Sequence, residues 1–222
     1  VIIFMPAYDC YEPAVKVNGG KTIPIQLSAP DYKVNWKEVA SKISPKTKMI
    51  LINSPHNPSG TIWHKEDMLE LQKITKGTNI IVLSDEVYEH ILFDGEQHQS
   101  ACLFTDLKER SFITASFGKT FHNTGWKNDY MQDPETYLGL NSFFQQKRDL
   151  FLDLISESRF KFKPSKGAYF QVLDYSDITD ENDVDFAKRL IKTYGIASIP
   201  LRFCFAKTDE TLRAAAEILN KI

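Results

Sequence analysis

The chain has 222 residues, of which 42% are hydrophobic and 25% are charged, the composition of an ordinary globular protein of one or two domains. Its formal net charge is −2, so the charge balance favours neither nucleic acid nor an anionic membrane as a partner. No apolar run approaches the ~20 residues that a membrane-spanning helix needs, and the opening VIIFMP lacks the features of a signal peptide.

The cysteines and histidines form no metal-binding pattern. Cys10, Cys102 and Cys204 are far apart and show no CxxC spacing, and the five histidines match neither HExxH nor another ligand spacing. We therefore expect no metal site. We interpret the cysteines as the reduced thiols of a cytoplasmic protein.

Strand and helix patterns alternate along the first part of the chain. Short apolar runs predict strands at 1–5, 22–27, 49–53, 80–84 and 112–116, and helical spacing occurs at 11–17, 36–42 and 66–76. Pro24 limits the second strand to a sheet edge, because proline cannot donate to a ladder. The continuous hydrophobicity of the other runs suggests strands that are buried on both faces. This alternation predicts an α/β layer with a mostly parallel sheet.

The later part of the chain has a different order of elements. Its hydrophobic pattern predicts a long amphipathic helix at 134–156, a strand at 168–173 and a helix at 183–194. It then predicts strands at 197–199 and 201–206 and a final helix at 210–222. This order predicts a smaller α+β unit. We place the domain boundary so that a large domain covers residues 1–127 and a small domain covers 128–222.

Two segments place polar residues at the ends of predicted strands. ILINSPHNPSG, residues 50–60, ends a strand in a loop that presents Asn57, and IIVLSDEVYEHI, residues 80–91, ends a strand at Asp85, with Tyr88 following. A plain turn is one interpretation of the first loop, and a helix N-cap is one interpretation of Asp85. The alternative is a ligand site, because parallel sheets bind ligands at the carboxyl ends of their strands.

The segment SFITASFGKTFHNTGWK, residues 111–127, has three competing interpretations. A phosphate-binding P-loop requires glycine where Ile113 stands, so the Gly-Lys-Thr at 118–120 fails that test. Ser116 and Lys119 match the SxxK motif of serine acyl-transfer enzymes, but the SDN and KTG partners are missing. In the third interpretation Lys119 forms a Schiff base, while Ser116 and Lys127 bind a phosphate.

Together and in this order, the segments resemble those of the fold-type I, pyridoxal 5′-phosphate (PLP)-dependent aminotransferases of class I and II. LRFCFAK at 201–207 completes the series, and PAYDCYEP at 6–13 is most similar to the branch of methionine and kynurenine–glutamine aminotransferases. The resemblance covers nearly the whole chain. It implies the type I fold, in which a mostly parallel central sheet with helices on both faces forms a large cofactor-binding domain, followed by a smaller α+β C-terminal domain.

The resemblance implies five contacts to the cofactor ring. Lys119 would hold PLP as a Schiff base and move the proton between the substrate Cα and the cofactor C4′. Asp85 would pair with the pyridine nitrogen and keep it protonated. Asn57 and Tyr88 would donate to the 3-oxygen, and Tyr8 would stack on the ring.

The resemblance also implies phosphate and substrate contacts. Ser116 and Lys127 would bind the cofactor phosphate, and Arg202 would clamp the substrate α-carboxylate through a bidentate pair. Taken alone, Arg202 would be interpreted as a surface charge in a strand. The implied assembly is a homodimer.

The activity implied is transamination between an amino acid of hydrophobic, sulfur-containing or aromatic type, such as methionine, kynurenine or glutamine, and a 2-oxo acid. One alternative is a cysteine-conjugate β-lyase, which uses the same cofactor to release pyruvate and ammonia. Another is a fold-type I protein that has lost the cofactor and binds a partner or a ligand.

The sequence departs from the family pattern at three places. The portion that the family carries before VIIFMP is absent, the hydrophobic-Gly continuation after Lys127 is replaced at once by Asn128, and the loop after Pro200 is missing. We expect that residues of a longer chain are omitted at the two internal places. In that case the Cα atoms across each junction would be separated by more than the ~3.8 Å of a bonded pair, whereas bonded distances would indicate a deletion variant.

Overall fold

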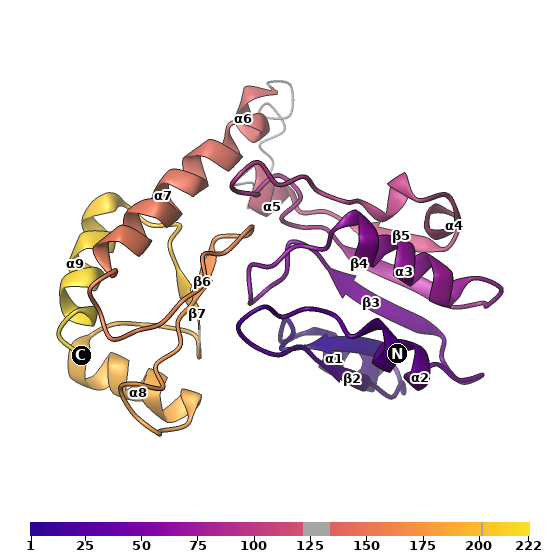
Figure 1. Ribbon diagram of the computed structural model, residues 1–222, viewed down its shortest axis with the longest axis horizontal. Helices are drawn as coiled ribbons and strands as arrows, with labels where there is room; N and C mark the ends of the chain where they lie inside the picture. The colour runs from indigo at the N-terminus through magenta and orange to yellow at the C-terminus, as the bar shows by residue number, and fades with distance from the viewer. Residues whose placement is uncertain (122–133, 201) are drawn as a thin grey trace.

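The computed structural model describes residues 1–121, 134–200 and 202–222. Figure 1 shows two lobes, a first lobe at residues 1–121 around a five-stranded sheet and a second lobe in the remaining described residues around a two-stranded sheet. The Lys127–Asn128 and Pro200–Leu201 junctions lie outside the described residues.

The sheet of the first lobe is parallel throughout, as predicted. Its strands lie in the order β2-β1-β3-β4-β5, and each pairs in parallel with its neighbours. Their bounds are Ile23–Gln26 (β2), Ile2–Met5 (β1), Met49–Asn53 (β3), Ile81–Asp85 (β4) and Ser111–Thr114 (β5). Pro24 lies in β2 at the edge of the sheet, which confirms the prediction from its missing N–H.

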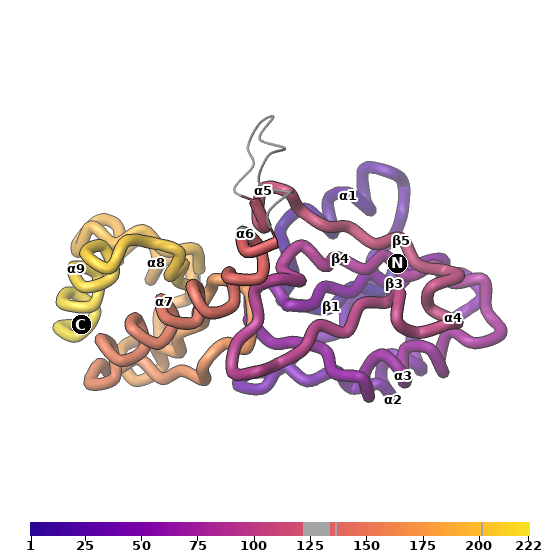
Figure 2. The backbone as a smooth tube through the Cα atoms, turned by 90° about the horizontal axis from the view of Figure 1, so that it is seen from above, coloured from indigo at the N-terminus to yellow at the C-terminus, as the bar shows by residue number. Residues whose placement is uncertain are grey.

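Helices lie on both sides of this sheet, as predicted. Figure 2 shows α1 and α5 on one side and α2 and α3 on the other. Their bounds are Tyr11–Val17 (α1), Trp36–Lys42 (α2), Lys65–Thr75 (α3), Thr105–Lys108 (α4) and Phe117–Thr120 (α5), with a 3₁₀ turn at Ala101–Leu103. Val39, Met68 and Leu71 of α2 and α3 are buried in one cluster with Ile50 and Val82 of the strands. Since α1 has no fully buried residue, the core of this lobe lies on the α2–α3 side.

Burial decreases towards the β5 edge of the sheet, which corrects one prediction. β1 and β3 are buried on both faces, but β4 alternates between buried and accessible positions, and β5 has no fully buried residue. Phe112 is 64% exposed and Ile113 is 37% exposed. The reason is that β5 is the last strand of the described sheet, and an apolar run does not distinguish a terminal strand from a central one.

The second lobe combines helices with one antiparallel strand pair. Phe170–Val172 (β6) pairs with Arg202–Cys204 (β7), and the helices are Glu135–Leu138 (α6), Leu140–Leu154 (α7), Asp183–Tyr194 (α8) and Asp209–Leu219 (α9). This is the α+β unit that the sequence predicts. Within the described ranges, no helix is long and apolar enough to cross a bilayer.

Two predicted elements of this lobe differ in the structure. The single helix expected at 134–156 is divided at Gly139 into α6 and α7. The strand expected at 197–199 is absent, because Ile199 makes only an isolated bridge to Arg202, and the described residues offer no strand that would extend this pairing. A β-branched run of three residues cannot by itself indicate whether a partner strand is available.

The core of the second lobe also includes residues from the first. Tyr88, Ile91 and Phe93, which follow β4, belong to the same buried cluster as Phe144 of α7 and Phe205. The segment after β4 therefore connects the parallel sheet to the second lobe. The predicted boundary between residues 127 and 128 lies outside the described residues, so the division into two domains there stays a prediction.

Arg148 of α7 stabilises the packing of the segment after β4 against the second lobe. Its side chain is 4% exposed, and its guanidinium donates to both carboxylate oxygens of Asp94 at 2.9 and 2.7 Å and to the carbonyl of Ser165 at 2.8 Å. It also lies 4.8 Å from the ring centre of Phe93. The hydrogen bonds from Arg148, and next those from Lys166, lower the pKa of Asp94.

We expect Arg148→Met to lower the free energy of unfolding by about 2 kcal/mol at neutral pH, because it removes the two charged hydrogen bonds to Asp94 and leaves Lys166 as the partner of that carboxylate. A carboxyl whose pKa is depressed in the folded state stabilises the protein above its unfolded pKa of about 4 and loses that contribution as the pH falls further. The stability difference between the variant and the parent should therefore shrink below about pH 4. Urea denaturation at several pH values measures it, with Arg213→Met, at an exposed arginine, as the control. A difference that stays constant with pH would contradict the assignment.

Candidate active site

The loops that leave the carboxyl ends of β1, β3, β4 and β5 converge, as expected for a parallel sheet. They meet β6 and β7 of the second lobe around a cavity of about 280 Å³. The lining residues are Tyr8, Tyr11, Asn53, Asn57, Asp85, Val87, Tyr88, Lys119, Phe170, Ile199 and Arg202. Among the residues predicted for the site, six line this cavity. Ser116 stands beside it at the start of α5, and Lys127 lies outside the described residues.

Asn57 is held by the loop after β3. Its backbone N–H donates to the side-chain oxygen of Asn53 at 2.7 Å, and Asn53 donates to the backbone carbonyl of Asp85 at 2.9 Å. Asn57 is 7% exposed. Arg202 Nη1 donates to Asn57 Oδ1. Because arginine can only donate, the amide nitrogen of Asn57 is left as the donor toward the cavity.

The rest of this loop is built from buried polar contacts. His56 Nδ1 lies 2.7 Å from the hydroxyl of Ser59, and burial lowers the pKa of His56 to about 4, so the ring is neutral at physiological pH. Gly60 has a φ of +68°, and a Cβ at that position would lie 2.5 Å from the Cβ of Ser165. Glycine is therefore required here both by the backbone conformation and by the close approach of the second lobe.

Asp85, at the end of β4, presents a carboxylate whose two oxygens are both held. Oδ1 accepts from the backbone N–H of Val87 at 3.2 Å, and Oδ2 accepts from the hydroxyl of Tyr11. Burial raises the pKa of Tyr11, and the negative charge of Asp85 raises it further. Tyr11 is thus a protonated donor, and the helix N-cap interpretation of Asp85 does not apply, because no helix follows β4 directly.

Tyr88 supplies a second protonated phenol. It is 2% exposed, and its ring makes edge contacts with Tyr169 at 5.2 Å and with Phe170 at 6.3 Å between ring centres. Burial raises the pKa of Tyr88, and the neighbouring Tyr169 raises it further. Its hydroxyl therefore stays a hydrogen-bond donor throughout the physiological range.

Lys119 lies on the short helix α5, which starts at the N-cap Ser116. The hydroxyl oxygen of Ser116 accepts from the backbone N–H of Lys119 at 3.2 Å, which keeps its own O–H free to donate. Lys119 Nζ lies 5.4 Å from the ring centre of Tyr169. The partly buried Lys119 side chain thus lines the cavity next to an aromatic ring.

Arg202, in β7, is buried at 6% exposure, so its interpretation as a surface charge is wrong. Besides Asn57, its guanidinium faces Phe170 at 5.3 Å from the ring centre, and Asp9 lies 3.8 Å from Nη2. Its Nε is buried and has no hydrogen-bond partner among the described residues. A buried donor without a partner on the wall of a cavity indicates a position for an anionic or polar ligand group.

Five lining residues were not predicted from the sequence: Tyr11, Asn53, Val87, Phe170 and Ile199. A signal for Tyr11 exists, because it stands three residues after Tyr8 in PAYDCYEP. The ring centres of the two tyrosines lie 5.7 Å apart in an edge arrangement, and Tyr8 is 44% exposed. Asn53 and Phe170 sit within apolar strands, where sequence alone does not indicate the direction of a side chain.

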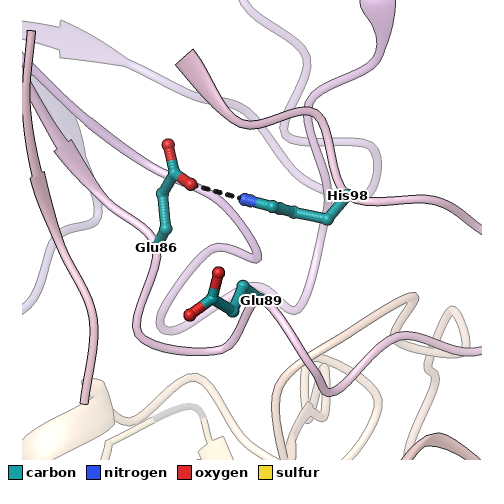
Figure 3. A group of neighbouring side chains, drawn as sticks. All are labelled: Glu86, Glu89 and His98. Carbon is teal, nitrogen blue, oxygen red and sulfur yellow. Dashed lines mark hydrogen bonds and ion pairs between the residues drawn. The ribbon is translucent and has the colours of Figure 1, made fainter. Parts of the chain in front are cut away.

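A separate polar cluster lies next to Asp85 but outside the cavity lining. Figure 3 shows Glu86, Glu89 and His98, whose candidate ligand atoms lie within 4.8 Å of one another. Glu86 already accepts from His98 at 2.8 Å, from Ser84 at 2.7 Å and from the N–H of Ala101 at 3.0 Å. Burial acts to raise the pKa of Glu86, but these hydrogen bonds outweigh it and lower the pKa. We interpret the cluster as a structural tie between the end of β4 and the segment at 98–101.

The family profile described as aminotransferase class I and II matches residues 1–130 and 127–219. The chain belongs to this family. Its members depend on PLP. The match confirms the predicted resemblance, and its two ranges overlap at 127–130, where the sequence departs from the family pattern after Lys127.

Individual relatives agree with this membership. The chain is 36% identical to a methionine aminotransferase of Escherichia coli K12, over 100% of this chain and 70% of that protein. It is 30% identical to human kynurenine–oxoglutarate transaminase 3, over 99% of this chain and 65% of that protein. The chain thus spans about two thirds of the length of these aminotransferases. The first alignment extends over 269 residues against the 222 of this chain, so that relative carries internal stretches that this chain lacks.

A solved structure confirms the predicted fold class of this chain. A crystal structure of an Escherichia coli protein with a methionine aminotransferase function matches with a TM-score of 0.94 at 36% identity, over 100% of this chain and 71% of that one. An N-succinyldiaminopimelate aminotransferase from Mycobacterium tuberculosis matches with a TM-score of 0.91 at 25% identity. The type I fold is therefore common to the chain and to aminotransferases with different named substrates.

Proposed function

We propose that this chain catalyses PLP-dependent transamination between an amino acid and a 2-oxo acid. The observation that carries the proposal is a single cavity that brings together an amine, Lys119, a carboxylate, Asp85, and a buried arginine, Arg202. The three residues come from two lobes and are far apart in the sequence. Family membership supports the same reaction.

The side chains of the cavity suit a pyridine ring that carries a phenolic oxygen. The Asp85 carboxylate would hold a proton on the ring nitrogen. The amide nitrogen of Asn57 and the hydroxyl of Tyr88 would donate to the 3-oxygen, and Tyr8 would stack on the ring. When bound, PLP supplies an electron sink that stabilises negative charge at the substrate α-carbon.

The remaining groups would act on the phosphate and on the substrate. Ser116, with its free O–H, and Lys127 would bind the phosphate. Arg202 would bind the α-carboxylate, and its unpartnered Nε supports a fork-like contact to two oxygens. Lys119 would hold the cofactor through its amine until the amine of the substrate takes that place, and the freed amine would then move the proton between the substrate α-carbon and the cofactor C4′.

The named relatives support amino donors of the methionine and kynurenine type, with glutamine as a further candidate. Neither of these two relatives is named as a β-lyase. The large PLP-binding domain at residues 1–127 and the small domain at 128–222, the homodimer, and the cytoplasmic location are parts of the same proposal. Three free cysteines, two of them exposed, support a reducing compartment.

Product analysis tests the proposed reaction. The full chain, loaded with PLP, is incubated with methionine, kynurenine or glutamine and a 2-oxo acid acceptor, and both products are measured. Transamination gives equal amounts of the new 2-oxo acid and of the amino acid formed from the acceptor. Release of ammonia and pyruvate from a cysteine conjugate, without transfer to the acceptor, would instead indicate the β-lyase reaction. No product from any donor would refute the proposal.

A further inference from the structure

The phenol of Tyr11 connects the start of α1 to the end of β4 at the floor of the cavity. Tyr11 and Asp85 are 74 positions apart in the sequence, yet the Tyr11 hydroxyl donates to Asp85 Oδ2. Tyr11 is the first residue of α1, and its backbone N–H donates to the carbonyl of Tyr8 at 3.1 Å. The same short segment therefore carries the aromatic residue proposed to stack on the cofactor and a direct contact to the carboxylate proposed to face the ring nitrogen.

We propose that Tyr11 is a positioning residue for the cofactor, which aims the Asp85 carboxylate at the ring nitrogen. This inference rests on the proposed function and adds a residue that the sequence motifs leave without a role. Tyr11 would influence cofactor binding only by orienting Asp85. Its contribution to the affinity for the cofactor should therefore depend on the presence of the ring nitrogen.

The geometry supports a positioning role. Val87 holds one oxygen of Asp85 through its N–H, and Tyr11 holds the other. With both oxygens fixed, the carboxylate cannot rotate freely about its last bond. Each carboxylate oxygen has two lone pairs, so Oδ2 can still accept from a ring N–H while it accepts from Tyr11.

The surroundings of Tyr11 keep its phenol protonated, so that the hydroxyl remains a hydrogen-bond donor. The side chain is mostly buried, and both burial and the adjacent carboxylate keep its phenol protonated. A phenol that stays protonated donates its one hydrogen to the carboxylate, and in the structure that hydrogen bond goes to Asp85 Oδ2. Because α1 has no fully buried residue, its packing alone does not fix where its first residue stands, and the contact to Asp85 contributes to that placement.

Tyr11→Phe removes the hydroxyl and keeps the ring, which makes it the appropriate test. The probes are PLP and its 1-deaza analogue, in which a C–H replaces the ring nitrogen. Loss of one hydrogen bond to a charged group predicts an affinity for PLP that is about tenfold lower. The affinity for the deaza analogue should change less than about twofold, because that ring offers Asp85 no N–H. Dissociation constants are measured by absorbance and fluorescence titration of the full chain.

A double-mutant cycle with Asp85→Asn separates positioning from general packing. In the Asp85→Asn background, Tyr11→Phe should no longer weaken PLP binding, since the carboxylate through which it acts is gone. Equal losses for PLP and the deaza analogue, or equal losses in both backgrounds, would overturn the inference and assign Tyr11 a packing role. Unchanged PLP affinity in Tyr11→Phe would overturn it as well. If the parent chain itself fails to bind PLP, the proposed function fails, and the inference fails with it.

Discussion

Lys119→Ala is expected to abolish the visible absorbance band that PLP gives when it is joined to a lysine, and to reduce turnover by at least about 10³-fold. The reason is that the amine would supply both the covalent attachment and the proton transfer, and a positioned general acid–base alone contributes about 10²–10⁴. PLP should still enter the cavity, because Asp85, Asn57 and Tyr88 remain. The measurement is the spectrum of the variant with excess PLP, followed by the transamination rate.

A neighbouring lysine provides the control for this prediction. Lys207 is exposed and lines, together with Lys119, the adjacent cavity, but it does not line the proposed cofactor site. Lys207→Ala should keep both the band and the turnover. A Lys119→Ala protein that retains the band would show that PLP attaches elsewhere and would refute the assignment of the lysine. If labelling with a β-lactam or phosphonate instead modified Ser116, the acyl-transfer interpretation would replace it.

Arg202→Gln is expected to lower kcat/KM for both the amino acid and the 2-oxo acid by about 10²–10³-fold, since removing one partner of a desolvated charge pair costs about 2–5 kcal/mol. The spectrum with PLP should be largely retained, because Arg202 is proposed to contact the substrate rather than the cofactor. The variant also removes the hydrogen bond to Asn57 Oδ1, so a modest change in cofactor affinity is expected in addition.

A substrate that lacks the carboxylate isolates the proposed role of Arg202. The amine analogue of methionine, which has no α-carboxylate, should react slowly with the parent and should lose little further rate in the variant. Arg189→Gln is the matched control, because Arg189 also combines a carboxylate partner, Glu181, with an aromatic contact, but it lies on α8 away from the cavity. Equal losses for methionine and for its amine analogue would contradict the carboxylate clamp.

Much of the frame around the cavity follows from local sequence patterns. Apolar runs that end in Asn53 and Asp85 predict β3 and β4, and parallel strands place their carboxyl ends at one edge. That edge is where the structure places Asn57, Asp85 and Lys119. Pro24 likewise marks β2 as an edge strand from its covalent structure alone. These predictions succeed because each depends on a property of a short segment.

Other features depend on contacts between distant segments, which no short segment encodes. The bond from Tyr11 to Asp85 and the clamp from Arg148 to Asp94 join residues 74 and 54 positions apart. Arg202 alone suggests an exposed charge, and only its packing against Asn57 and Phe170 shows that it is buried. Phe112 is exposed because β5 is the last strand of the described sheet. A central strand could have the same apolar sequence, so the sequence alone does not predict this exposure.

Titration of the full chain with PLP, followed by absorbance, tests the central claim most directly. We expect a visible band to grow to a stoichiometry of one PLP per chain, and addition of methionine to remove the band as the amino group is transferred. A following addition of a 2-oxo acid should restore it. A chain that binds no PLP, or whose visible absorbance band does not change when any of the amino acids is added, would contradict the proposed function.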